Sequence, residues 1–67
     1  MEHELNPIRE AMQATPGAAV DLFNALYQGA DDDKRKEMLI HQDPSGNTML
    51  MVAVNSECQV MVQRLLA

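Results

Sequence analysis

The stretch 43–66, DPSGNTMLMVAVNSECQVMVQRLL, determines the fold that we expect for this chain. It begins with a turn of the type I pattern, because Asp43 can accept backbone hydrogen bonds and Pro44 fixes φ at the second position. Thr48 then offers an N-cap for a short apolar helix, and a second helix follows the polar break at 55–57. The stretch therefore predicts a helical hairpin preceded by a polar finger, residues 43–48.

The two helices of this hairpin differ in where their apolar residues fall. The first, 49–54, reads MLMVAV and is apolar on every side, which is typical of a helix covered by protein all round. The second is amphipathic, and Ser56 is placed to cap it, with Gln59 at the capping-box position. The first helix, which we call the inner helix, therefore has more apolar surface than one hairpin can cover.

The same stretch resembles one ankyrin repeat, a unit that pairs a β-turn with two helices around a T-P-L-H-x-A core. The residues that carry this resemblance, without a gap, are Asp43, Gly46, Thr48, Leu50, Ala53, Val62, Leu65 and Leu66. The sequence departs from the family pattern where Met49 replaces the proline and Met51 the histidine. A further departure is Glu57, which stands where the family has a glycine that allows left-handed backbone.

The resemblance implies a protein-interaction module that binds partners through the finger and the exposed edge of the inner helix. Carried over by position, with Met51 added from the inner helix, the candidate partner-binding residues are Pro44, Ser45, Asn47, Met51, Asn55 and Ser56. It also implies that 43–67 is one repeat, that 1–42 is a helical lead-in or N-terminal cap, and that the chain is the N-terminal part of a longer repeat protein. The alternative left open is a helical assembly or regulatory domain of a larger protein, such as an enzyme.

Composition limits the possible functions. A chain of 67 residues is a single domain, and a core of this size seldom supplies more than roughly 3–5 kcal/mol of stability. The net charge of −5 argues against binding to nucleic acid or to an anionic membrane, because both select for Lys and Arg. We therefore expect a protein partner of basic or mixed charge, or self-association.

Localisation follows from three features. Cys58 is the single cysteine, so no disulfide can form within the chain, and a reducing compartment is the simpler assumption. The N-terminus lacks the basic and apolar regions of a signal peptide, and no apolar run reaches the roughly 20 residues of a membrane span. These features predict a cytoplasmic protein, although a protein exported by a specialised machine would look the same.

The remaining helices are predicted from their start and stop signals. The pair Asn6–Pro7 predicts a helix start, with 1–5 frayed, and Thr15–Pro16 ends that helix and starts the next. Gly29 ends the second helix, and one of the aspartates at 31–33 can cap the third. We thus expect an all-α domain with helices near 6–14, 17–28, 32–41, 48–54 and 57–66. Its predicted core consists of Leu50, Ala53, Val62 and Leu65, joined by Phe23 and Leu39.

No residue pattern indicates catalysis or a metal site. His3 and His41 have no cysteine or second histidine at ligand spacing, and the run 31–33 lacks the spacing that calcium requires. Gly-rich phosphate loops are also missing. We therefore expect a non-enzymatic protein without a metal, a cofactor or a small-molecule substrate.

Overall fold

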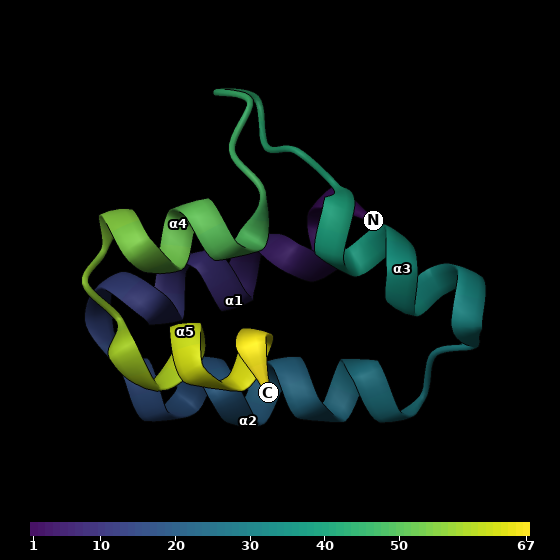
Figure 1. The fold of residues 1–67 in the computed structure, drawn as a ribbon, viewed down its shortest axis with the longest axis horizontal. Coiled ribbons are helices and arrows are strands. Elements are labelled where there is room, and N and C mark those ends of the chain that lie inside the picture. Colours follow the sequence, from purple (N-terminus) through teal and green to yellow (C-terminus); the bar gives the residue numbers. More distant parts are fainter.

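The protein folds as five helices with no strand. The computed structural model describes all residues from 1 to 67 (Figure 1). Its helices are α1 (Glu2–Ala14), α2 (Pro16–Gln28), α3 (Asp32–Ile40), α4 (Met49–Asn55) and α5 (Gln59–Leu66). The prediction of an all-α fold with five short helices is confirmed.

The helices are arranged as two antiparallel pairs with one helix at the side. In Figure 1 the α4–α5 pair lies in front of the α1–α2 pair, with α4 against α1 and α5 against α2. At one end, α3 connects α2 to the loop that contains the finger, which projects away from the body. This arrangement buries one face of the α4–α5 pair and leaves its front uncovered.

The N-terminal segment is helical and its Leu5 is buried, so the prediction that residues 1–5 fray and that the first helix starts at Asn6 was wrong. Helix α1 already begins at Glu2, and Leu5 is 0% exposed. Leu5 shares the buried face of α1 with Ile8 and Met12. The apolar i, i+3, i+7 spacing of these three side chains continues the helix past the start signal at Asn6.

Pro7 lies inside α1, where its missing N–H removes one helical hydrogen bond. Two ion pairs fasten the turn in front of it: Glu2 pairs with Arg9, and Glu4 pairs with Lys34 of α3 at 2.9 Å. Acidic side chains in a first turn also interact favourably with the helix dipole. Together with the burial of Leu5, these contacts offset the lost hydrogen bond.

The core is one cluster of buried residues drawn from every helix. Its members are Leu5, Ile8, Met12, Ala19, Phe23, Ala30, Met38, Met49, Val52, Ala53, Cys58 and Met61. Methionines therefore fill much of the interior, as suits a chain with few aromatic residues.

The predicted core is correct in part. Phe23 and Ala53 are buried, and Val62 and Leu65 pack at its margin. Two predictions of burial were wrong: Leu50 is only half-buried, with Met49 buried in its place, and Leu39 is 39% exposed, with Met38 buried in its place. The reason is that 38–40 and 49–54 are runs of apolar residues, so no polar neighbour indicates which face of the helix turns inward.

Two of the predicted helix caps are present. The side chain of Asp31 accepts a hydrogen bond from the backbone N–H of Lys34 at 2.8 Å. The hydroxyl of Thr48 accepts one from the N–H of Met51 at 3.4 Å. The predicted cap at Ser56 was wrong, because Ser56 ends α4 and no side chain caps α5.

The turn between α4 and α5 is a Schellman motif built on a residue other than glycine. The N–H of Cys58 donates to the carbonyl of Ala53 at 2.9 Å, and the N–H of Glu57 donates to that of Val54 at 3.1 Å. These are the two bonds that define the motif. Glu57 occupies its left-handed position with φ 55°, so it adopts the geometry that glycine would favour.

Candidate functional site

The finger is a closed turn held by hydrogen bonds to the carboxylate and the carbonyl of Asp43. The Asp43 carboxylate accepts hydrogen bonds from the N–H groups of Ser45 and Asn47, both at 2.9 Å. The N–H of Gly46 donates to the Asp43 carbonyl at 2.8 Å, and Gly46 has φ 86°, a conformation that suits glycine. The predicted turn is confirmed. These bonds fix the loop and leave Pro44 and Ser45 exposed at its tip.

A group of charged residues ties the base of the finger to α1. His41 Nε2 lies 3.1 Å from the Glu2 carboxylate, and its Nδ1 lies 3.6 Å from that of Glu37. The hydrogen bond with His41, followed by that from Arg9, lowers the pKa of Glu2 below its ordinary value. Arg9 itself is buried, and its Nη1 also donates to Asn6 at 3.0 Å. The finger is therefore anchored at its base as well as closed at its tip.

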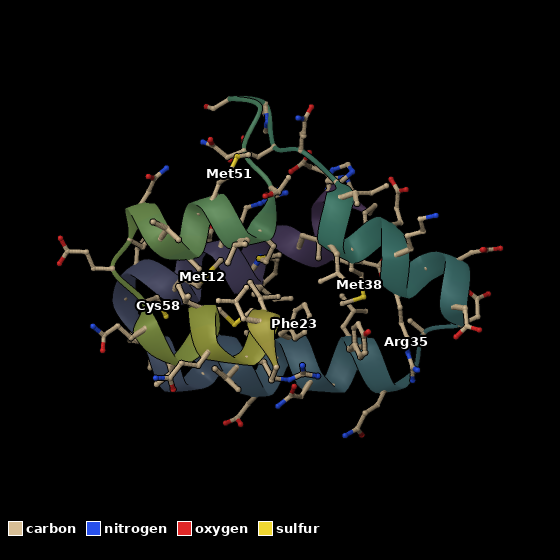
Figure 2. All side chains as sticks on the ribbon, in the orientation of Figure 1. Met12, Phe23, Arg35, Met38, Met51 and Cys58 are labelled. Carbon is tan, nitrogen blue, oxygen red and sulfur yellow. The ribbon has the colours of Figure 1, made fainter.

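Beside the finger, one side of α4 forms a shallow hollow, which we term the outer stripe. It is lined by Asn47, Leu50, Met51, Val54 and Asn55. Met51 is 48% exposed and Val54 56% exposed, both large fractions for apolar side chains in so small a domain. Figure 2 shows Met51 extending from α4 on the side where the finger projects. The outer stripe and the finger together form one surface of apolar and carboxamide groups.

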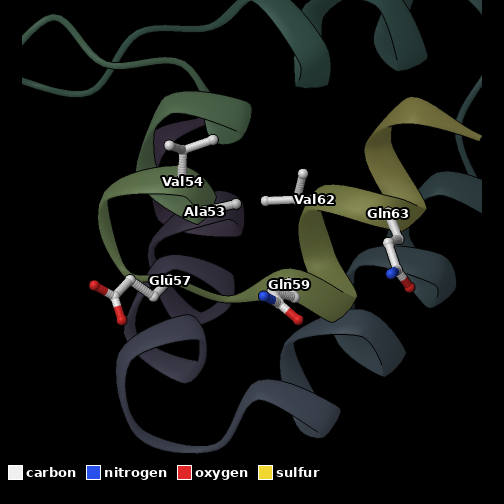
Figure 3. Close-up of a pocket in the computed structure, with 6 residues that line it drawn as sticks. All are labelled: Ala53, Val54, Glu57, Gln59, Val62 and Gln63. Atoms are coloured by element: carbon white, nitrogen blue, oxygen red, sulfur yellow. The ribbon is translucent and has the colours of Figure 1, made fainter.

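A second hollow, the α4–α5 groove, lies on the uncovered front of the helix pair (Figure 3). Its lining residues are Ala53, Val54, Glu57, Gln59, Val62 and Gln63. In Figure 3 Ala53 and Val62 point towards one another between the two helices and Val54 stands on α4 beside them, whereas Glu57 and Gln59 lie near the turn and Gln63 on α5. The groove thus has an apolar floor and a polar rim whose single charge is the Glu57 carboxylate.

The cations of the chain are mostly engaged within the fold. Arg35 donates to the Tyr27 carbonyl at 2.9 Å, and its guanidinium lies 4.8 Å from the Tyr27 ring centroid. Arg64 hydrogen-bonds Asn24 and lies 5.2 Å from the ring centroid of Phe23. Arg9 and Lys34 form the ion pairs of α1, which leaves Lys36 as the remaining basic side chain. The net charge of −5 is therefore presented to solvent mainly as unpaired carboxylates.

The structure brings three of the six predicted partner-binding residues together. Asn47, Met51 and Asn55 follow each other at i, i+4, i+8 and line the outer stripe. The other predicted residues do not line it: Pro44 and Ser45 lie at the tip of the finger, and Ser56 at the end of α4.

Sequence reasoning missed two residues of the outer stripe and the whole α4–α5 groove. Leu50 and Val54 line the stripe, although Leu50 was assigned to the core. The i, i+4 spacing from Leu50 to Val54 was a signal that could have placed both on the same helix face as Met51. The groove had no such signal, because its two walls come from different helices.

Two further findings concern metals and membranes. The structure contains no group of three or more His, Cys, Asp or Glu side chains arranged to hold a metal ion. None of its helices combines the length and the apolar composition that crossing a bilayer would require.

Comparison with known proteins gave no match to this chain, whether with a family model, a curated protein or a solved structure.

Proposed function

We propose that this chain is a non-catalytic protein-interaction module that binds a partner protein through the finger and the outer stripe of α4. The observation that carries the proposal is the joint position of Asn47, Met51 and Asn55 in one hollow beside a closed and anchored turn. A rigid turn loses little conformational entropy on binding, and carboxamides beside exposed apolar side chains provide both hydrogen bonds and contact area.

The ankyrin-like character of 43–66 belongs to this proposal. Three local features support it: the turn closed by Asp43, the N-cap at Thr48 and the left-handed backbone at Glu57. The last feature is informative, because the family glycine at that position would adopt the same conformation. A repeat of this kind buries its apolar faces against neighbours, which is consistent with the exposure of Met51 and Val54.

The partner is expected to be a protein of basic or mixed charge. The chain has a net charge of −5, and most of its cations are used in internal contacts. Opposite charge accelerates association and is screened by salt, so binding should weaken as the ionic strength rises. Methionine at position 51 would make the contact adaptable, because its side chain is flexible and polarisable.

Site-specific photo-crosslinking tests the proposal. A photo-reactive amino acid is placed at Met51 in the cells that produce the protein, and crosslinked proteins are identified by mass spectrometry. The matched control carries the same group at Gln13, an exposed position of α1 that does not line the outer stripe. We expect a protein adduct from position 51 that is missing at position 13. Adducts of equal yield at both positions, or none at position 51, would refute the proposal.

A second variant separates binding from folding. Met51→Glu places a charge in the outer stripe without altering the core, because Met51 is 48% exposed. It should abolish capture of the crosslinked partner and leave helix content, measured by circular dichroism, unchanged. Undiminished capture by this variant would place the partner elsewhere on the molecule.

Assembly with copies of itself or within a larger protein is a second candidate function. The observation that favours it is the exposure of large apolar side chains on α5, with Val60 48% and Leu66 69% exposed. Light scattering after size-exclusion chromatography would reveal a dimer or larger species, and Val60→Glu should return it to a monomer. A monomer at all concentrations tested would eliminate self-association.

A further inference from the structure

The α4–α5 groove combines small and branched apolar residues on its floor with polar groups on its rim. Ala53 at its floor is 0% exposed, so the apolar surface open to an occupant belongs to Val54 and Val62. Figure 3 shows Val62 pointing from α5 towards Ala53, with Val54 extending from α4 beside it. A depression between two antiparallel helices with this lining fits a ridge of apolar side chains, such as one helix presents at i, i+3, i+4 and i+7 spacing.

Glu57 marks the rim of this groove and occupies an unfavourable backbone conformation. Its φ of 55° lies in the left-handed region, which is less favourable for a residue with a Cβ than for glycine. The Glu57 side chain is exposed and forms no ion pair or hydrogen bond within the chain, so no contact of the fold stabilises a carboxylate there. The left-handed backbone belongs to the Schellman turn, whereas the carboxylate has no partner within the fold and is free to pair with a cation of an occupant.

The charge at the groove determines what kind of occupant suits it. Gln59 and Gln63 complete the rim and carry no charge, and no Lys or Arg lines the groove. A second copy of this chain would bring another net charge of −5 to this face. In a twofold dimer it would also bring the two Glu57 carboxylates towards each other. A basic partner has neither disadvantage.

We propose that the α4–α5 groove binds an amphipathic helix of a partner protein, which packs its apolar ridge against Val54 and Val62 and pairs a Lys or Arg with Glu57. This surface is separate from the finger and the outer stripe, apart from the shared Val54. The proposal therefore goes beyond the interaction function proposed above, and it can be tested without changing Met51 or Asn47.

Two synthetic helical peptides provide the probe. Both carry Leu at i, i+3, i+4 and i+7, and they differ only in their flanking charges, which are Lys in one and Glu in the other. The affinity of the 67-residue chain for each peptide is measured by fluorescence anisotropy, and the contact is mapped by the NMR shifts of the valine methyl groups. We expect the Lys peptide to bind more tightly and to shift the methyl signals of Val54 and Val62.

Variants at the rim test whether the Glu57 carboxylate causes the preference for the Lys peptide. Glu57→Gly should weaken binding of the Lys peptide by about two- to five-fold, the range typical of an exposed ion pair, while raising the thermal stability of the chain. Glu57→Lys should reverse the preference so that the Glu peptide binds more tightly. Gln63→Lys, an exposed change that leaves the turn intact, should act in the same direction. The matched control is Gln28→Lys on α2, which adds the same charge away from the groove and should leave the preference unchanged.

Three results would overturn the proposal. The first is equal affinity for the two peptides, or shifts confined to residues outside the groove. The second is a Glu57→Gly variant that keeps the full preference for the Lys peptide. The third is a dimer of the unmodified chain whose interface protects Val62, because the occupant would then be a second copy. If Met51→Glu loses binding and the rim variants do not, the result concerns the outer stripe and not the groove. Failures of the two proposals can therefore be distinguished.

Discussion

Replacing Leu5 by alanine tests the most unexpected feature of the fold, the anchoring of the N-terminal helical segment by this buried side chain. Leu5 is 0% exposed and lies in the single core cluster. Truncating a fully buried leucine to alanine costs about 2–5 kcal/mol, because the transfer energy is lost and a cavity remains. A domain of 67 residues has a total stability of only about 3–10 kcal/mol, so Leu5→Ala should remove much of it.

Leu39→Ala is the matched control, since it removes the same atoms from a residue that is 39% exposed. It should cost about 1 kcal/mol or less, because no closed cavity forms. Urea unfolding of both variants is followed by the helical circular dichroism signal. With a slope of about 1 kcal/mol per molar urea for so small a domain, Leu5→Ala should lower the midpoint by about 2 M or more.

The outcome that refutes this reasoning is a wild-type midpoint for Leu5→Ala. Residues 1–5 would then be frayed in solution, as the start signal at Asn6 predicted. An equal loss of stability in Leu39→Ala would show instead that α3 turns Leu39 rather than Met38 into the core.

Three further predictions concern the finger and the N-terminal ion pairs. Gly46→Ala should cost about 1 kcal/mol and lower Tm by about 4–8 °C, because φ at this position is 86°; an unchanged Tm by calorimetry would contradict that conformation. Asp43→Ala removes the acceptor of two backbone N–H groups, so amide exchange at Ser45 and Asn47 should accelerate with helix content unchanged, and unaltered exchange would count against a closed turn. The hydrogen bond from Lys34, the largest cause, lowers the pKa of Glu4 below its ordinary 4.5, so this pair stabilises the fold above that pH and its contribution fades as pH falls through the folded-state pKa. Urea unfolding should therefore find Glu4→Gln less stable than the unmodified chain at neutral pH and equal to it in strong acid, and a deficit that persists in acid would contradict the pairing.

Local signals predicted the helix content and much of the chain's local geometry. The turn at Asp43 and the caps at Asp31 and Thr48 are formed by side chains that bond to backbone within four residues. Such contacts depend only on neighbours in the sequence, so turn and capping rules recover them. Three of the six candidate partner-binding residues also fell on one surface, because α4 brings Met51 and Asn55 together at i and i+4 and Asn47 lies just before this helix.

Tertiary contacts decided where the first helix begins. Asn6–Pro7 is a sound start signal, yet Leu5 is buried and α1 extends back to Glu2, whose carboxylate meets Arg9 and, far along the chain, His41. No pattern in residues 1–10 could indicate a partner at position 41.

The sequence by itself determined that this chain forms helices, where most of them end, and that its finger is a closed turn. The tertiary structure decided which apolar residues face inward, since Met38 and Met49 are buried where Leu39 and Leu50 were expected. It also created the α4–α5 groove, whose walls come from two helices and whose rim depends on the left-handed backbone at Glu57. The physical reason is one of range: caps and turns are satisfied by neighbouring residues, whereas the inward face of an apolar run is fixed only by the surface against which it packs.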